Sequence, residues 1–299
     1  MKRTRGFVLS AVLTLFVGTN IASAGSIYLS GHDILLHSGQ RGYDGVILDY
    51  LRGAGTASEI AKADYSISVV GSGVGFGAFT GGPSMGGAMA SGTVLTNSGS
   101  IAGYGTTTYY KTGTGADWAT ILAADVLIIL DHTSCGGCDL STAGVAEILA
   151  NKAAITTAFN AGMDIWGGSG ASEAGYYAAF LPPTAAASGA PIGGSSGFNP
   201  TAAGTAIGIV GGVGATSMTN GFPTHNRFSS FDPAFTVFEV RPQTSGDEII
   251  SIGLRDARIT DGGIDPTGGT TGGAVPEPAT LLLLGAGLAG IRWASSRKA

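Results

Sequence analysis

Residues 124–130, Ala-Asp-Val-Leu-Ile-Ile-Leu (ADVLIIL), are the clearest predicted strand of the chain. From Val126 to Leu130 every side chain is apolar, without the alternation that a half-exposed strand would show. A strand that is covered on both faces reads as such a continuous run, and parallel sheets are usually covered on both faces. The stretch therefore predicts a central strand of a parallel sheet, with helices on both sides.

The segments around this strand alternate between strand-like and helix-like patterns. The predicted strands are 26–30, 66–70 and 163–166, and the predicted helices are 43–52, 141–160 and 172–180. Ser141 or Thr142 would cap the helix 141–160, and Gly162 would end it. This order is typical of an α/β fold, so we expect a doubly wound domain with a largely parallel sheet.

Other parts of the central region differ from this pattern. Residues 235–240 and 248–254 are separated by a turn-like segment, which predicts a late antiparallel strand pair. Two stretches rich in Gly, Ser and Thr, Gly71–Tyr110 and Thr184–Gly214, are expected to be long insertions of loops and short strands. The glycines of 71–77 lack the G-x-G-x-x-G spacing, so no dinucleotide or other cofactor is predicted.

The first 24 residues have the layout of a secretory signal peptide. A basic head precedes an apolar run from Phe7 to Val17, and Ala22-Ser23-Ala24 supplies a small-x-small cleavage site. The apolar run is shorter than the roughly 20 residues that a membrane-spanning helix needs. We expect export through the secretion translocon and cleavage after Ala24, so that the mature chain begins at Gly25.

The C-terminal segment is also apolar but short. It runs from Ala279 to Ile291, and a basic cluster follows it at once, consisting of Arg292, Arg297 and Lys298. This run of 13 residues is shorter than the roughly 17 that a spanning helix needs at least, and the segment barely reaches that limit when it is counted from Pro276 to Trp293. The basic cluster would stay on the cytoplasmic side. Pro276 and Pro278 keep the preceding residues extended. These features indicate a transient tether to the inner membrane.

Val275-Pro276-Glu277-Pro278, the apolar run and the basic cluster that begins at Arg292 together resemble the PEP-CTERM sorting signal of exported bacterial proteins. The resemblance implies processing by an exosortase-type enzyme, removal of the tail, and a cell-surface or extracellular destination, often in the context of exopolysaccharide and biofilm or floc formation. The chain then divides into a signal peptide (1–24), a globular domain (25–260), a Gly/Thr-rich linker (261–274) and the sorting signal with its short transmembrane segment (275–299).

The charge of the central region is more acidic than that of the whole chain. The chain has 15 Lys and Arg and 20 Asp and Glu, but six of the basic residues and only Glu277 of the acidic ones lie in the two terminal segments. The remaining nine basic and 19 acidic residues give the central region a net charge of −10. This charge argues against nucleic acid as a partner and favours contacts that a cation mediates.

All four histidines follow predicted strands or lie in long loops; they are His32, His37, His132 and His225. The carboxyl ends of parallel strands form the ligand crevice of an open α/β sheet. We therefore expect several chemically active side chains to gather there, namely His32, Asp33, Asp131, His132, Cys135, Cys138 and Asp139. This group is the candidate site of the sequence.

Cys135 and Cys138 are the only two cysteines, and they are spaced as C-x-x-C after the central strand. In an exported protein this spacing first indicates a disulfide that pins the turn. A redox-active pair is one alternative. Another is a zinc site that also uses His132 and His32, although the second C-x-x-C that would strengthen the zinc hypothesis is missing.

A nucleophile is a further interpretation of Cys135, because a helix N-terminus after a central strand lowers a thiol pKa. The region from Ile27 to Leu254 resembles the class I glutamine amidotransferase-like fold, with ADVLIILDHTSC at its elbow and NGFPTHNRF in a late loop. Thr133 interrupts the Gly-x-Cys-x-Gly elbow, and Asn226 and Arg227 after His225 depart from the His-x-Glu of that group. Amidotransferase activity is therefore not expected.

Two functions remain open. The first is a sorted surface or matrix protein that binds exopolysaccharide or another surface component without catalysis. The alternative is a secreted hydrolase or amidase-like enzyme whose candidate catalytic residues are Cys135, His132, His225 and His32.

Overall fold

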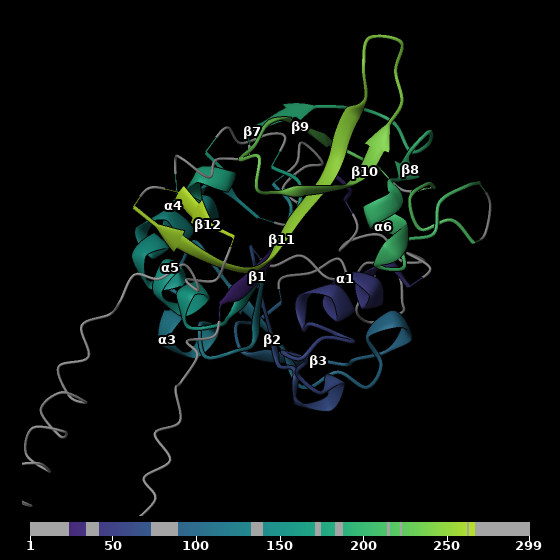
Figure 1. The fold of residues 1–299 in the computed structure, drawn as a ribbon. Helices are drawn as coiled ribbons and strands as arrows, with labels where there is room; N and C mark the ends of the chain where they lie inside the picture. The colour runs from purple at the N-terminus through teal and green to yellow at the C-terminus, as the bar shows by residue number, and fades with distance from the viewer. Residues whose placement is uncertain are drawn as a thin grey trace, which may run out of the picture.

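The fold is built on one large sheet, shown in Figure 1. The computed structural model describes residues 24–33, 42–72, 89–132, 140–170, 175–182, 188–213, 216–221, 223–261 and 263–266. Within these ranges the sheet has twelve strands, and the path through its hydrogen-bonded neighbours is β3-β4-β2-β5-β6-β1-β11-β10-β8.

The centre of the sheet is parallel. Its strands are, in spatial order, β4 (Thr107–Lys111), β2 (Ile67–Gly71), β5 (Val126–Ile129), β6 (Asp164–Gly167) and β1 (Gly25–Ser30). All residues of β5 and β6 are buried, and for β5 this agrees with the continuous apolar run of the sequence. We call the edge of the sheet where these strands end the carboxyl edge, and the edge where they begin the amino edge.

Antiparallel strands extend this centre on both sides. β3 (Thr93–Leu95) pairs with β4, and β11 (Glu248–Thr260) pairs with β1 and with β10 (Thr236–Arg241). The remaining strands also pair in antiparallel fashion; they are β7 (Ser188–Pro191), β8 (Asn199–Pro200), β9 (Asn226–Ser230) and β12 (Gly263–Asp265). The late strand pair is confirmed, but the sheet as a whole is mixed, and the expected largely parallel order holds only at its centre.

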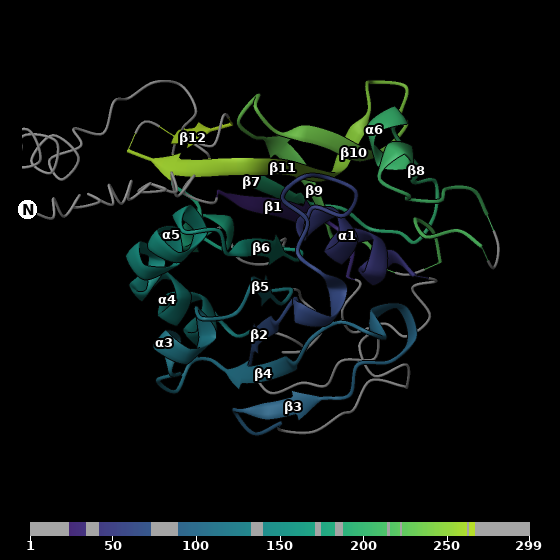
Figure 2. The same ribbon diagram turned by 60° about the horizontal axis from the view of Figure 1, so that its bottom comes forward.

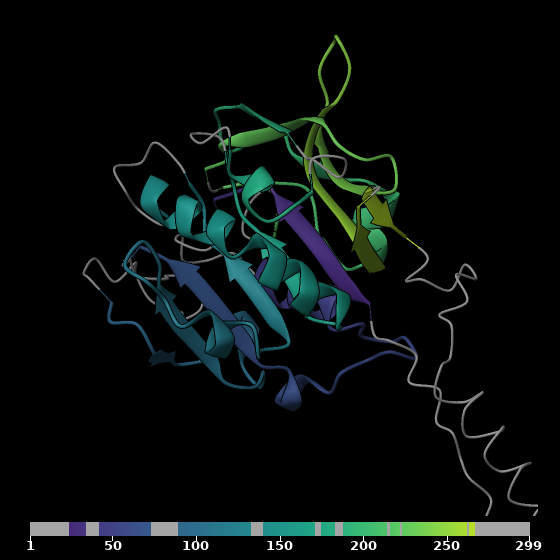
Figure 3. The same cartoon turned by 90° about the vertical axis from the view of Figure 1, so that its left-hand side faces the viewer.

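Helices lie on both faces of the parallel strands (Figure 2). α1 (Tyr43–Leu51) covers one face, and α3 (Trp118–Ile121), α4 (Thr142–Ala150) and α5 (Lys152–Asn160) cover the other. Figure 3 shows the teal helices of this second layer in front of the parallel strands. The short α6 (Ala202–Ala206) lies beside β8 and β10.

The predicted helix 141–160 is in fact two helices. Ser141 caps the first, since its hydroxyl accepts a hydrogen bond from the Gly144 amide at 3.1 Å. Asn151 lies between α4 and α5 with a φ of −102°, and its side-chain amide donates to the Glu147 carbonyl at 2.9 Å. A side chain that bonds to the backbone of the preceding turn competes with continued helix, so the two helices meet at this residue.

Three short 3₁₀ turns complete the described elements: η1 (Lys62–Asp64), η2 (Gly99–Ile101) and η3 (Tyr177–Ala179). The third replaces the described part of the predicted helix 172–180. Tyr177 instead places its hydroxyl against the Gly168 carbonyl at 3.2 Å, so this segment closes over the end of β6.

The Gly-rich insertions and the linker contain more structure than the sequence indicates. The first insertion includes β4, which is a full member of the parallel centre. The second includes β7, β8 and α6. The predicted linker 261–274 begins with β12, which pairs with the end of β11. The short strands themselves agree with the expectation, whereas the position of β4 inside the sheet was not foreseen.

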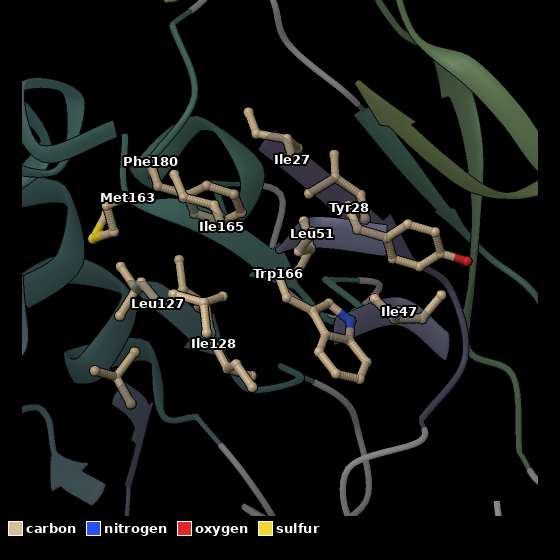
Figure 4. Close-up of a cluster of buried hydrophobic side chains, with 14 of the residues drawn as sticks. Ile27, Tyr28, Ile47, Leu51, Leu127, Ile128, Met163, Ile165, Trp166 and Phe180 are labelled. Carbon is tan, nitrogen blue, oxygen red and sulfur yellow. The ribbon is translucent and has the colours of Figure 1, made fainter. Parts of the chain in front are cut away.

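The core fills both sides of the central strands (Figure 4). Trp166 of β6 is 1% exposed and points toward Ile47 of α1, while Ile165 points to the opposite side, toward Phe180. Ile128 lies in register with Trp166 on the neighbouring strand. Because successive side chains of a strand point to opposite faces, each central strand contributes to both layers of the core.

The described chain enters and leaves the sheet at the amino edge. Gly25, the first residue of β1, pairs with Ala257 of β11, and Asp265 of β12 pairs with Arg258 of the same strand. The two ends therefore lie on either side of one strand, about 10 Å apart.

Within the described ranges no helix has the length and hydropathy to cross a membrane. Residues 1–23 and 267–299, which include the apolar run of the predicted signal peptide, the predicted C-terminal membrane segment and the sorting residues, lie outside these ranges.

Candidate functional site

Three of the four histidines are described, and all three lie at the carboxyl edge. His32 and Asp33 follow β1, Asp131 and His132 follow β5, and the bridge between His32 and Thr224 brings His225 to the same edge. Leu29, Gly167 and Ile129 are in register across β1, β6 and β5. His32 and His132 therefore lie about 10 Å apart, two strand spacings across the sheet.

His32 belongs to a buried polar network. It is 1% exposed, its Nδ1 is 2.7 Å from the Thr224 hydroxyl and its Nε2 is 3.2 Å from Oε1 of Glu239. The ring also packs edge-on against Tyr43 and Phe198, with centroid distances of 6.0 and 5.1 Å. A side chain held on all sides in this way cannot reach a substrate at the surface.

Glu239 is the centre of this network. Its Oε2 accepts hydrogen bonds from the hydroxyls of Tyr43 and Ser251, both at 2.5 Å, and of Tyr28 at 3.2 Å. Burial raises the pKa of Glu239, but the His32 ring and the hydroxyl donors outweigh it, so the pKa lies below its ordinary value. A buried carboxylate needs such partners, because an unpaired buried charge is costly. The network thus joins β1, α1, β10 and β11.

His225 has a different environment. Its Nε2 is 3.2 Å from Oδ2 of Asp33, and its side chain is 31% exposed while that of Asp33 is 1% exposed. The backbone fixes the pair, since the amides of His225 and Asn226 both donate to the Gly31 carbonyl. A buried carboxylate that orients a partly exposed imidazole is an arrangement used in general base catalysis.

His132 lies on the other side of β6. Its backbone amide donates to the Ser169 carbonyl at 2.7 Å, and its Nε2 is 3.3 Å from the Thr142 hydroxyl at the start of α4. Asp131 is fully buried, and one of its carboxylate oxygens accepts a hydrogen bond from the Ser169 amide. A Cβ at Gly168 would lie 2.0 Å from this oxygen, so only glycine fits beside Asp131.

The expected single cluster therefore separates into three parts among the described residues. His32 bonds to Thr224 and Glu239, His225 to Asp33, and His132 to Thr142. No group of three or more metal-ligating side chains occurs in the part of the chain that the structure describes. The other members of the predicted site, Cys135, Cys138 and Asp139, lie outside it, and so does the fourth histidine, His37. The disulfide, the zinc site and the cysteine nucleophile therefore stay predictions.

Another buried carboxyl group lies at the opposite, amino edge. Asp164, the first residue of β6, is 4% exposed; its Oδ1 accepts from the Ser26 amide and its Oδ2 from the Tyr65 hydroxyl, both at 2.6 Å. Burial raises the pKa of Asp164 to about 8. A pocket of about 30 Å³, bordered by Ala24, Ser26 and Asp256 among others, opens beside it.

Sequence reasoning missed Glu239 and Asp164. Both are single carboxylates within strand-like segments and have no motif around them. Their roles depend on partners that are distant in the sequence, 207 residues away for Glu239 and His32 and 138 for Asp164 and Ser26. Only information on which distant residues contact one another could have identified these two carboxylates.

Replacing Glu239 with alanine should lower the free energy of unfolding by about 3–5 kcal/mol, because His32 and three hydroxyls lose their acceptor in the core. Urea unfolding of the exported protein, followed by circular dichroism, measures this loss. Glu59→Ala is the matched control, since Glu59 is an exposed partner of Arg52 and its removal should cost far less. Equal losses for the two variants would contradict the structural role of the network.

The C-terminal end of the chain matches a known family model. Residues 274–298 match the PEP-CTERM protein-sorting motif. No curated protein and no solved structure matches the chain, so the resemblance to the class I glutamine amidotransferase-like fold is not supported. The matched motif implies an exported protein that exosortase processes, with a cell-surface or extracellular fate.

Proposed function

We propose that this chain is a surface or extracellular-matrix protein that an exosortase-type enzyme releases from the inner membrane and whose domain acts by binding. The match of residues 274–298 to the sorting motif carries the proposal. In the proposed sequence of events, the secretion translocon exports the chain and the C-terminal segment holds it in the membrane. The enzyme then acts at the motif.

The charge and the geometry of the domain support binding as its activity. The central region carries a net charge of −10, which favours contacts with acidic matrix polysaccharides through a shared divalent cation. His32, one of the candidate catalytic residues, is enclosed in the Glu239 network, where it supports the core. The partners that we propose are the processing enzyme and exopolysaccharide.

Alanine at all three positions of the Pro276-Glu277-Pro278 triplet should abolish processing, because the enzyme would lose the motif that it reads. In a host with an exosortase, the variant should remain at full length in the membrane fraction, whereas the parent chain becomes shorter and leaves the cell. Immunoblots of cell fractions measure both. The control is alanine at Thr270 and Thr271, just before the motif, which should be processed normally. Release of the triplet variant at the parent's rate would contradict the proposal.

The processed protein should co-sediment with acidic matrix polysaccharide in the presence of Ca²⁺, and a chelator should release it. The reason is that two polyanions attract one another only through a cation that both bind. A panel of acidic and neutral polysaccharides, each with and without Ca²⁺, tests this. Retention on no member of the panel under either condition would contradict binding of polysaccharide.

A hydrolase is the second candidate, and the Asp33–His225 pair favours it. The pair lies at the carboxyl edge, where an α/β enzyme places its chemistry, and part of the imidazole faces solvent. In this alternative His225 would serve as the base for Cys135, which follows β5 in the sequence.

The oxidation state of the cysteines decides between these candidates. We expect Cys135 and Cys138 of the exported protein to react with a thiol reagent only after reduction, since an oxidising compartment favours a disulfide at this spacing. Mass spectrometry of the labelled protein counts the free thiols. A blocked pair excludes both the nucleophile and the zinc site, whereas two free thiols in the native protein would contradict the disulfide.

A further inference from the structure

The start of β1 is enclosed by its neighbours. Gly25 pairs with Ala257 of β11 on one side, and a Cβ on Gly25 would lie 2.3 Å from the Met163 carbonyl oxygen and 2.6 Å from the Phe159 ring on the other. Any larger residue would push against backbone, so the position requires glycine. The expected cleavage would make Gly25 the first residue of the mature chain. The new N-terminal residue therefore occupies a position that admits only glycine.

This enclosure also bears on when cleavage takes place. A protease binds its substrate as an extended strand, and in the folded domain the strand that begins at Gly25 is already paired on both sides, with β6 and β11. The Ala24–Gly25 bond must then be cut before β1 takes its place in the sheet. Water cleaves this bond, and the products are a carboxylate on Ala24 and an ammonium group on Gly25.

Asp164 lies where this ammonium group would form. Its Oδ1 is 2.6 Å from the Ser26 nitrogen, and the Gly25 nitrogen is one residue earlier, so the two groups lie within about 6 Å of each other. The adjoining pocket has a volume of about 30 Å³, enough for a water-sized group such as an ammonium.

Asp164 has no cationic partner among the described residues. Arg52 and Arg255 also border the pocket, but Arg52 pairs with Asp49 and Glu59, and the Arg255 guanidinium lies over the Tyr50 ring at 4.3 Å. Buried without a cation, the carboxyl group is held in its neutral form through much of the neutral range, since burial raises its pKa to about 8.

We propose that removal of the signal peptide leaves the α-ammonium group of Gly25 beside this pocket, which Ala24 and Ser26 border, as the cationic partner of Asp164, and that the ion pair fixes β1 in the sheet. This inference rests on the proposed export and cleavage after Ala24. A chain that still carries its leader has an amide nitrogen at this position and cannot form the pair. The precursor is therefore less stable than the mature domain, which suits a chain that must cross a translocon unfolded.

A double-mutant cycle on the exported protein tests the pair. Two threonines inserted between Ala24 and Gly25 move the new ammonium group two residues away from Asp164, because a single insertion would leave it at the place of Ala24, which borders the same pocket. The insertion should lower the urea midpoint of the parent protein but have little effect in an Asp164→Asn background. Asp256→Asn is the matched control, because it removes an exposed carboxylate that borders the same pocket, and there the insertion should keep its full effect.

A chemical measurement complements the cycle. At pH 7 the Gly25 amine of the native protein should acylate about ten times more slowly than the amine of the urea-unfolded protein, because a nearby carboxylate favours the unreactive ammonium form. This comparison needs no variant, and the Asp164→Asn protein should lose the protection if it folds.

Three results would overturn the inference. They are equal effects of the insertion with and without Asp164, equal acylation rates in the native and unfolded states, and a mature chain that begins at a residue other than Gly25 by mass spectrometry. None of them bears on sorting at the C-terminal motif, whose failure would show as retention of the tail.

Discussion

Strand β5 lies between β2 and β6 with helices over both faces, so none of its side chains reaches water. The burial of β5 on both faces constrains the composition of the strands and helices around it. Every neighbouring strand must contribute apolar side chains to two layers, and any polar group that enters must bring its partners with it. Asp164 and Glu239 satisfy that condition with the Ser26 amide, hydroxyl groups and the His32 ring.

The parts of the fold that the sequence predicts well are those whose cause is local. The apolar run of β5, the helix-like pattern of 43–52 and the turn between β10 and β11 each lie within one segment, and the structure has all three. The parts that it does not predict depend on distant partners. From the sequence alone, β4 belongs to a glycine-rich stretch that predicts loops, and its place in the sheet comes from its pairing with β2. In the same way, β12 belongs to a predicted linker, and it forms a strand by pairing with the end of β11.

The same distinction applies to the candidate site. His32 and His132 lie at the carboxyl edge, as their positions after two predicted strands indicate, because parallel strands end together. Sequence position could not separate a histidine that supports the core from one that faces solvent, since His32 and His225 differ only in what surrounds them. The sorting motif needs no such context, because the processing enzyme reads it as a linear segment, and it therefore gives the destination of the chain more directly than the domain gives its activity.

Gly25 and Asp265 lie on either side of the same strand at the amino edge. Both ends of the described chain therefore leave the sheet at one edge, whereas the Asp33–His225 pair lies at the other. Any attachment made through residues beyond Asp265 would start on the far side of the sheet from this pair, so the point of attachment and the partly exposed imidazole would be separated by the length of the central strands.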